Sequence, residues 1–128
     1  MKALLDTHVW LWYVSGSSRL SGIHRRLIEK AGTELWLSPI SIWEAYMLIE
    51  KKKLGAIGSR DEWLEDAFRL LDLREAPITF KIAARSRDIT LPHSDPADRF
   101  IAATAAEMKI PLLTVDENLI GCPDITCR

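Results

Sequence analysis

Ala3-Leu4-Leu5-Asp6, near the start of the chain, and Leu112-Leu113-Thr114-Val115-Asp116, near its end, are short apolar runs that each close on an aspartate. Runs of this kind are typical of buried strands in a parallel sheet, whose carboxyl ends meet at the edge where open α/β folds place their ligands. We therefore expect Asp6 and Asp116 to lie at the same edge of one sheet. For either aspartate alone, a helix cap at the turn after the strand is an equally good interpretation.

Between these two runs, apolar strands alternate with amphipathic helices. Strands are predicted at residues 2–5, 34–37, 76–78 and 112–115, with a further edge strand around Ile125. Helices are predicted at residues 7–14, 21–31, 59–71, 80–87 and 95–108, and from Ser38 to the lysines at 51–53. This alternation predicts an α/β fold with three α/β/α layers and a parallel sheet of about four or five strands. A chain of 128 residues fits a single domain spanning 1–128.

The composition excludes several classes of protein. With 48% hydrophobic and 27% charged residues, the chain is neither disordered nor fibrous, and no apolar stretch approaches the ~20 residues that span a bilayer. A formal charge of −1 gives no global basic signature, so a nucleic-acid partner has to be held by local Lys and Arg patches or by a bound metal. Cys122 and Cys127 lack the paired spacing of a zinc site, and we expect a cytoplasmic protein without a membrane partner.

Glu44 is a third acidic candidate, and its role depends on where its helix begins. The segment Ser41-Ile42-Trp43-Glu44 matches a capping box, in which Glu44 serves only the start of the helix. A start at Ser38, with Pro39 in the first helical position, instead puts Glu44 inside the helix on an otherwise apolar face. An unpaired carboxylate on such a face is unfavourable unless it faces a cleft. The other acidic candidates in the sequence favour the interpretation in which Glu44 faces a cleft.

Asp95 and Asp98 flank Pro96 with the spacing of an N-cap and the third residue of a helix. One of them therefore caps the helix that follows, whatever the protein does. We assign Asp95 to the cap and Asp98 to the site, with Arg99 beside it as a phosphate contact. The two aspartates can exchange these roles.

Carboxylates gathered in one place repel one another unless a cation lies between them. The candidates offer oxygen ligands only, whereas zinc sites recruit His or Cys and calcium loops have a local spacing that this sequence lacks. Oxygen ligands of this kind favour Mg²⁺ or Mn²⁺. Such an ion makes a water more acidic and offsets the charge that builds on a phosphodiester during in-line attack.

Four segments resemble the PIN-domain family, and within it the VapC-like toxin ribonucleases of toxin–antitoxin systems. They stand in the family's order and together cover essentially the whole chain: Leu4-Leu5-Asp6-Thr7-His8-Val9-Trp10-Leu11-Trp12, Ser38-Pro39-Ile40-Ser41-Ile42-Trp43-Glu44, His93-Ser94-Asp95-Pro96-Ala97-Asp98-Arg99 and Leu112-Leu113-Thr114-Val115-Asp116. Each segment alone is a weak signal, and the four together are a specific one. Ala97 departs from the pattern, because many relatives carry a bulky aromatic residue there. The departure affects packing behind Asp98 more than ligation.

The resemblance implies a Mg²⁺- or Mn²⁺-dependent endoribonuclease that leaves 5′-phosphate and 3′-hydroxyl ends on RNA. It also implies a homodimer that is silenced by a cognate antitoxin protein. The family's catalytic and metal-binding acids map onto Asp6, Glu44, Asp98 and Asp116. Thr7 and Thr114 stand beside the first and fourth acids, where a hydroxyl orients a ligand or a water.

Two other classes of function compete with the ribonuclease. A binding-only module keeps the fold and acts through a protein partner, and its acids are helix caps that take up no metal. A phosphohydrolase for small phosphate esters shares the strand-end aspartate and Mg²⁺. It usually needs a second aspartate two residues later, where this chain has His8.

The remaining polar and aromatic residues are weaker candidates. For His8 and His93 we favour hydrogen-bonded packing over proton transfer, and we expect His24 on the surface. The lysines at 51–53 fit a solvated helix end better than an RNA contact. Core packing is the commoner use of tryptophan, although three of the five tryptophans are candidates for stacking on bases: Trp10, Trp12 and Trp43.

Overall fold

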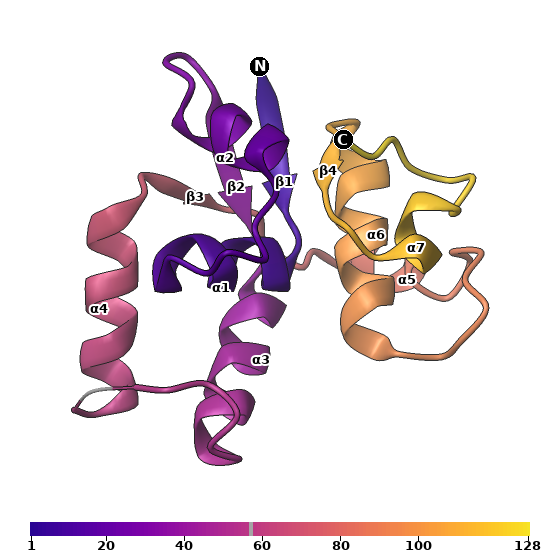
Figure 1. The fold of residues 1–128 in the computed structure, drawn as a ribbon. Coiled ribbons are helices and arrows are strands. Elements are labelled where there is room, and N and C mark those ends of the chain that lie inside the picture. Colours follow the sequence, from indigo (N-terminus) through magenta and orange to yellow (C-terminus); the bar gives the residue numbers. More distant parts are fainter. Residues whose placement is uncertain (57) are drawn as a thin grey trace.

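Among residues 1–56 and 58–128, which the computed structural model describes, four parallel strands form one sheet in the order β3-β2-β1-β4 (Figure 1). The strands are β1 (Lys2–Leu5), β2 (Glu34–Leu37), β3 (Leu73–Glu75) and β4 (Leu112–Leu113). The helices are α1 (Thr7–Ser15), α2 (Gly22–Glu29), α3 (Pro39–Glu50), α4 (Arg60–Leu70), α5 (Phe80–Arg85), α6 (Pro96–Met108) and α7 (Glu117–Ile120). In this described part of the chain, no helix has the length and apolar character of a membrane span.

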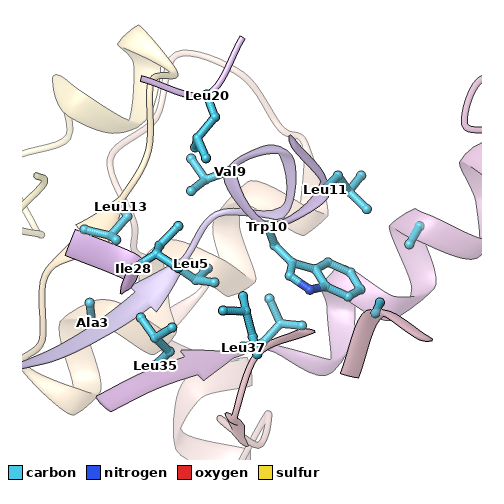
Figure 2. Packing of buried hydrophobic residues seen from close by; sticks show 13 residues of the cluster. Ala3, Leu5, Val9, Trp10, Leu11, Leu20, Ile28, Leu35, Leu37 and Leu113 are labelled. Carbon is cyan, nitrogen blue, oxygen red and sulfur yellow. The ribbon is translucent and has the colours of Figure 1, made fainter. Parts of the chain in front are cut away.

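Helices cover both faces of the sheet, because successive side chains of a strand point to opposite faces. On one face, Leu5 of β1 packs with Trp10 of α1 and Ile28 of α2, in the apolar cluster that Figure 2 shows. On the other face, Leu4 and Leu112 pack against residues of α5, α6 and α7. Figure 1 shows these last three helices gathered on one side of the sheet, with α1 and α4 on the other. The predicted three-layer α/β/α arrangement is confirmed.

Polar side chains at the ends of the strands start the helices. The Asp6 carboxylate caps α1 directly after β1. Ser38 follows β2 and caps α3, and Pro39 takes the first helical position. This start excludes the capping box beginning at Ser41 and leaves Glu44 inside α3. The alternative in which Glu44 is a purely structural cap is therefore wrong.

The third strand lies earlier in the chain than expected. β3 covers Leu73–Glu75, so the strand predicted at residues 76–78 is wrong. The Ala76 amide still donates to the Leu37 carbonyl at 2.9 Å, but Pro77 has no amide hydrogen and cannot continue the ladder. The residues of β3 are mostly exposed at the edge of the sheet. They form no apolar run that would mark the strand in the sequence.

The last strand is also shorter than predicted. β4 covers only Leu112–Leu113, because the chain turns after it toward α7. The Thr114 hydroxyl stabilises this turn by accepting a hydrogen bond from the Asp116 amide at 3.0 Å. The edge strand predicted around Ile125 is reduced, in the residues that the structure describes, to one isolated parallel bridge from β4 to Cys127.

His24 is buried, so the expectation that it lies on the surface is wrong. It is 5% exposed, and its Nε2 atom lies 2.7 Å from the Arg128 carbonyl oxygen. The contact joins α2 to a segment 104 residues away in the chain. A tertiary contact of this kind leaves no local pattern from which it could be predicted.

Candidate active site

A cleft of about 350 Å³ opens where the chain leaves the carboxyl ends of β1 and β4. Five carboxylates and three other side chains line it: Asp6, His8, Trp12, Glu44, Asp95, Asp98, Val115 and Asp116. The structure thus brings Asp6, Glu44, Asp98 and Asp116 into one cleft, together with Asp95.

The register of the sheet explains why residues so distant in the sequence meet. Leu5 of β1 lies opposite Leu113 of β4, so the residues that follow the two parallel strands emerge side by side. The Thr114 hydroxyl then donates to Asp6 Oδ2 at 2.7 Å. Asp116 stands two residues beyond Thr114, where it caps α7.

Asp6 is buried and its carboxylate is held at both oxygens. Oδ1 accepts a hydrogen bond from the Thr7 amide at 2.8 Å, and Oδ2 accepts the one from the Thr114 hydroxyl. Burial raises the pKa of Asp6, the bonds from Thr114 and Thr7 oppose the rise, and the charge of Asp116 adds to it. A carboxylate with both oxygens bonded in this way keeps one orientation in the cleft.

Glu44 reaches the cleft from α3 and is oriented by two hydroxyls. The Thr7 hydroxyl donates to Glu44 Oε1 at 2.5 Å, and the Ser41 hydroxyl lies 2.8 Å from the same Thr7 oxygen. Because the single Thr7 proton goes to the carboxylate, Ser41 donates to Thr7. Burial raises the pKa of Glu44, and the hydrogen bond from Thr7 partly offsets the rise.

Ser41 is the residue of this site that sequence reasoning missed. The sequence pattern puts it at the start of a capping box, whereas in the structure it lies within α3 and is fully buried. It precedes Glu44 by three residues, so the two side chains share one face of the helix. A serine that shares an apolar helix face with a carboxylate needs a hydrogen-bond partner. This requirement is the feature of the sequence from which Ser41 could have been identified.

Asp98 lies within the electrostatic field of every other carboxylate in the cleft. It belongs to the first turn of α6, and its side chain is 16% exposed. Burial and, after it, the negative charges of Asp95, Asp6, Asp116 and Glu44 raise the pKa of Asp98 to about 7. Asp98 therefore belongs to one acidic cluster with these four residues, three of which also cap helices.

The donor set of this cluster fits a hard divalent cation. As the side chains lie, the described residues contain no group of three or more His, Cys, Asp or Glu arranged to hold a metal ion. Mg²⁺ rarely takes a cage made entirely of protein, because it keeps several waters and usually contacts one or two carboxylates together with substrate phosphates. The cleft offers oxygen ligands and crowded negative charge, which match that mode of binding.

A family model for the PIN domain matches residues 3–121. The chain belongs to the PIN-domain family. It is also 36% identical over 119 residues to Ribonuclease VapC22 of Mycobacterium tuberculosis, in a match that covers 91% of this chain and 88% of that protein.

Solved structures share the fold of this PIN domain at low sequence identity. One of them is VapBC2 from Rickettsia felis, in a crystal structure bound to a promoter DNA fragment. It has a TM-score of 0.74 at 14% identity, and the match covers 100% of this chain and 98% of that chain. FitAcB from Neisseria gonorrhoeae has a TM-score of 0.66 at 21% identity, covering 98% of this chain and 95% of that chain. At these identities the likeness shows the fold.

Asp95 of this PIN domain both caps a helix and lines the cleft. Its Oδ1 atom accepts a hydrogen bond from the Ala97 amide at 3.0 Å, as predicted for the cap of α6. Its own amide donates to His93 Nδ1 at 3.2 Å. In the neutral ring the proton therefore sits on Nε2, which lies 3.5 Å from Asp98 Oδ2. His93 thus stands at the edge of the site beside Asp98.

Arg99 has a different role from the phosphate contact that we expected. Its guanidinium donates to three carbonyl oxygens, those of Ser86 at 3.3 Å, Ile89 at 2.9 Å and His93 at 3.2 Å. These bonds fasten the segment between α5 and α6, which carries His93 to the edge of the cleft. Because its guanidinium bonds to three carbonyls, Arg99 stabilises the segment beside the site. It is absent from the residues that line the cleft.

The other sequence candidates divide between the core and the surface of the PIN domain. Trp10 is fully buried and packs edge-on against Trp63, with ring centroids 5.6 Å apart. Trp43 is 58% exposed but is not among the residues that line the cleft. The lysines at 51–53 follow α3 and do not line it either. His8 is exposed and does line the cleft.

Proposed function

We propose that this PIN domain is an endoribonuclease that needs Mg²⁺ or Mn²⁺ and acts as the toxin of a toxin–antitoxin pair. The observation that carries the proposal is the single cleft into which separate segments bring Asp6, Glu44, Asp98 and Asp116. A divalent cation relieves the repulsion within such a cluster. The similarity to a protein named Ribonuclease VapC22 supports RNA as the substrate.

The proposed reaction is the hydrolysis of an RNA phosphodiester. A water oxygen forms a bond to phosphorus while the bond to the 3′ oxygen breaks, and that oxygen takes up a proton, which leaves 5′-phosphate and 3′-hydroxyl ends. A divalent cation in the cleft supplies positive charge that makes water more acidic and offsets the negative charge building on the phosphate. Asp6, Glu44, Asp98 and Asp116 would hold it, some directly and some through water.

The residues behind the acids keep the site ready for this chemistry. Thr114 and the amide of Thr7 hold Asp6, while the hydroxyl of Thr7, supported by Ser41, holds Glu44. These hydrogen bonds restrict the orientations of both carboxylates, and preorganised charge of this kind lowers a reaction barrier.

The direct test is to incubate purified protein with total RNA in Mg²⁺, in Mn²⁺ and in excess chelator, and to map the ends that appear. We expect cleavage with either metal, intact RNA in the chelator, and a 5′-phosphate at each cut. Undiminished cleavage in the chelator would remove the metal from the proposal. RNA that stays intact in all conditions would reject the ribonuclease. Calorimetric titration with Mn²⁺ then identifies a binding-only module, which should take up no metal.

Thr7→Val tests the positioning of Glu44. Valine keeps the shape of the side chain and the hydrogen bond from the backbone amide of residue 7 to Asp6. It removes the hydroxyl that contacts both Glu44 and Ser41. We expect kcat/KM to fall about 10- to 100-fold, the usual effect of removing a group that orients a ligand. The matched control is Thr104→Val, because Thr104 is also buried but its hydroxyl donates to the Phe100 carbonyl within α6, away from the acids. Equal activity of the two variants would contradict the role of Thr7.

The antitoxin partner and the homodimer also belong to the proposal. The structures of similar fold include a toxin–antitoxin complex from Klebsiella pneumoniae and a VapBC-5 structure from Mycobacterium tuberculosis, and these support an antitoxin protein as the partner. We expect a neighbouring small reading frame to encode it. Light scattering of the purified chain distinguishes a dimer from a monomer.

A further inference from the structure

The lining of the cleft supplies almost no basic side chains to hold RNA. Among the described residues that line it, none is Lys or Arg, and the only basic side chain is that of His8. Phosphates that approach five carboxylates meet repulsion, which a divalent cation offsets most strongly at the phosphate it touches. The neighbouring nucleotides therefore need another source of affinity. Proteins that bind single-stranded nucleic acid commonly find it in aromatic side chains, on which bases stack.

Trp12 supplies an aromatic surface inside the same cleft. It follows His8 by four residues in α1, so the two side chains share one face of the helix. Their ring centroids lie 6.0 Å apart with the planes tilted by 53°. Trp12 is half-buried, because it packs against the apolar core while it also lines the cleft. Val115, which is 42% exposed, adds further apolar surface to the lining.

The other tryptophans named as candidates do not have this combination of properties. Trp10 is fully buried in the cluster that Figure 2 shows, so no base can reach it. Trp43 is exposed, yet the cleft lining does not include it. Trp12 alone of the three both lines the cleft with the acids and packs against the apolar core.

We propose that Trp12 is a specificity-determining residue, on which the base next to the cleaved phosphodiester stacks. The inference rests on the proposed ribonuclease function and adds to it a residue that binds the base beside the cleaved bond. A base can stack on Trp12 only when it is free of a double helix. The substrate at this position is therefore single-stranded RNA, and a paired strand of the same sequence is a poor substrate.

The test compares the wild-type protein with Trp12→Leu and Trp12→Phe on a single-stranded RNA oligonucleotide that carries one mapped cleavage site. We expect kcat/KM of Trp12→Leu to fall about 10- to 100-fold, because a stacking contact is lost. Trp12→Phe keeps an aromatic face and should recover most of the loss. Trp43→Leu is the matched control and should cleave like the wild type. Circular dichroism melting of each variant separates a stacking defect from a folding defect.

Abasic RNA separates stacking from an indirect effect on α1. In a set of oligonucleotides, each nucleotide beside the cleavage site is replaced in turn by one without a base. We expect one position at which the wild type loses as much activity as Trp12→Leu loses on intact RNA. On that oligonucleotide, Trp12→Leu should lose nothing further, because the contact is already gone.

Two results would overturn the stacking proposal. The first is wild-type activity of Trp12→Leu, and the second is a loss that persists on every abasic oligonucleotide. If the wild-type protein cleaves no RNA, the ribonuclease function is rejected independently of the stacking proposal. In that case, fluorescence anisotropy of the labelled oligonucleotide with Mg²⁺ measures whether Trp12 contributes to RNA binding. Weaker binding by Trp12→Leu than by Trp43→Leu supports the stacking proposal, and equal binding or no binding rejects it.

Discussion

Asp98→Asn is expected to abolish RNA cleavage while making the metal-free protein more stable. The amide keeps the size of the side chain and removes a negative charge from the most crowded position in the cleft. Cleavage should fall at least about 100-fold, because the change removes one of the carboxylates that we propose as ligands of the metal. Stability should rise, because the charges of the other acids and burial both disfavour ionised Asp98.

The gain in stability should depend on pH, with a sign that follows from the raised pKa. In the unfolded chain the Asp98 carboxyl titrates near its ordinary value of about 3.9, whereas in the folded protein its pKa is about 7. Between these values the folded state holds a proton that the unfolded state releases. The free energy of unfolding of the wild type therefore falls as the pH rises through this window, and then levels off.

Thermal melting in chelator at pH 5 and at pH 8 measures this difference. Partial access to solvent screens some of the repulsion, so we expect Asp98→Asn to gain about 1–2 kcal/mol at pH 8, or about 5 °C in Tm. At pH 5 the two proteins should melt alike. Asp88→Asn, which changes an exposed aspartate outside the cleft lining, is the control. Full cleavage by Asp98→Asn, or the same Tm difference at both pH values, would contradict the assignment.

Trp10→Ala is expected to have the largest effect on folding. The indole is fully buried between the sheet and α4, where it packs with Leu37 and edge-on against Trp63. Truncation of a buried aromatic residue removes about 3–5 kcal/mol, and a domain of this size has only about 5–15 kcal/mol in total. Tm should fall by more than about 10 °C.

Trp10→Phe tests whether lost apolar packing causes the destabilisation expected of Trp10→Ala. The Trp10 indole nitrogen is buried without a hydrogen-bond partner among the described residues, so phenylalanine removes an unsatisfied polar atom together with part of the apolar surface. We expect it to lose much less stability than alanine. Trp43→Ala, at a position that is 58% exposed, should change the unfolding free energy by less than about 0.5 kcal/mol. Urea titration of the three variants measures these differences.

The position of the acids could be predicted because it follows from local rules. An apolar run followed by aspartate predicts a strand end, and parallel strands deliver their ends to one edge. Both Asp6 and Asp116 obey this rule. Asp95 could be recognised as a cap from Pro96, and the choice of Asp98 as the inward acid agrees with the charges that surround it.

The contacts that support the acids could not be predicted, because they depend on how distant segments pack. Ser41 contacts Thr7 only when α3 packs beside α1. The Arg99 guanidinium reaches the Ser86 and Ile89 carbonyls only when the segment between α5 and α6 folds against α6. β3 is a short, exposed edge strand with no apolar run to mark it. His24 is buried by a segment from the other end of the chain.

Three of the aspartates that line the cleft also cap helices. The side chains of Asp6, Asp95 and Asp116 belong to the cleft lining and cap α1, α6 and α7. Alanine at any of them would loosen a helix as well as remove a carboxylate from the cleft, and the two defects would be confounded. Asp98 lies inside α6 and does not cap it, so Asp98→Asn is the variant that we expect to suit the trapping and crystallisation of bound RNA.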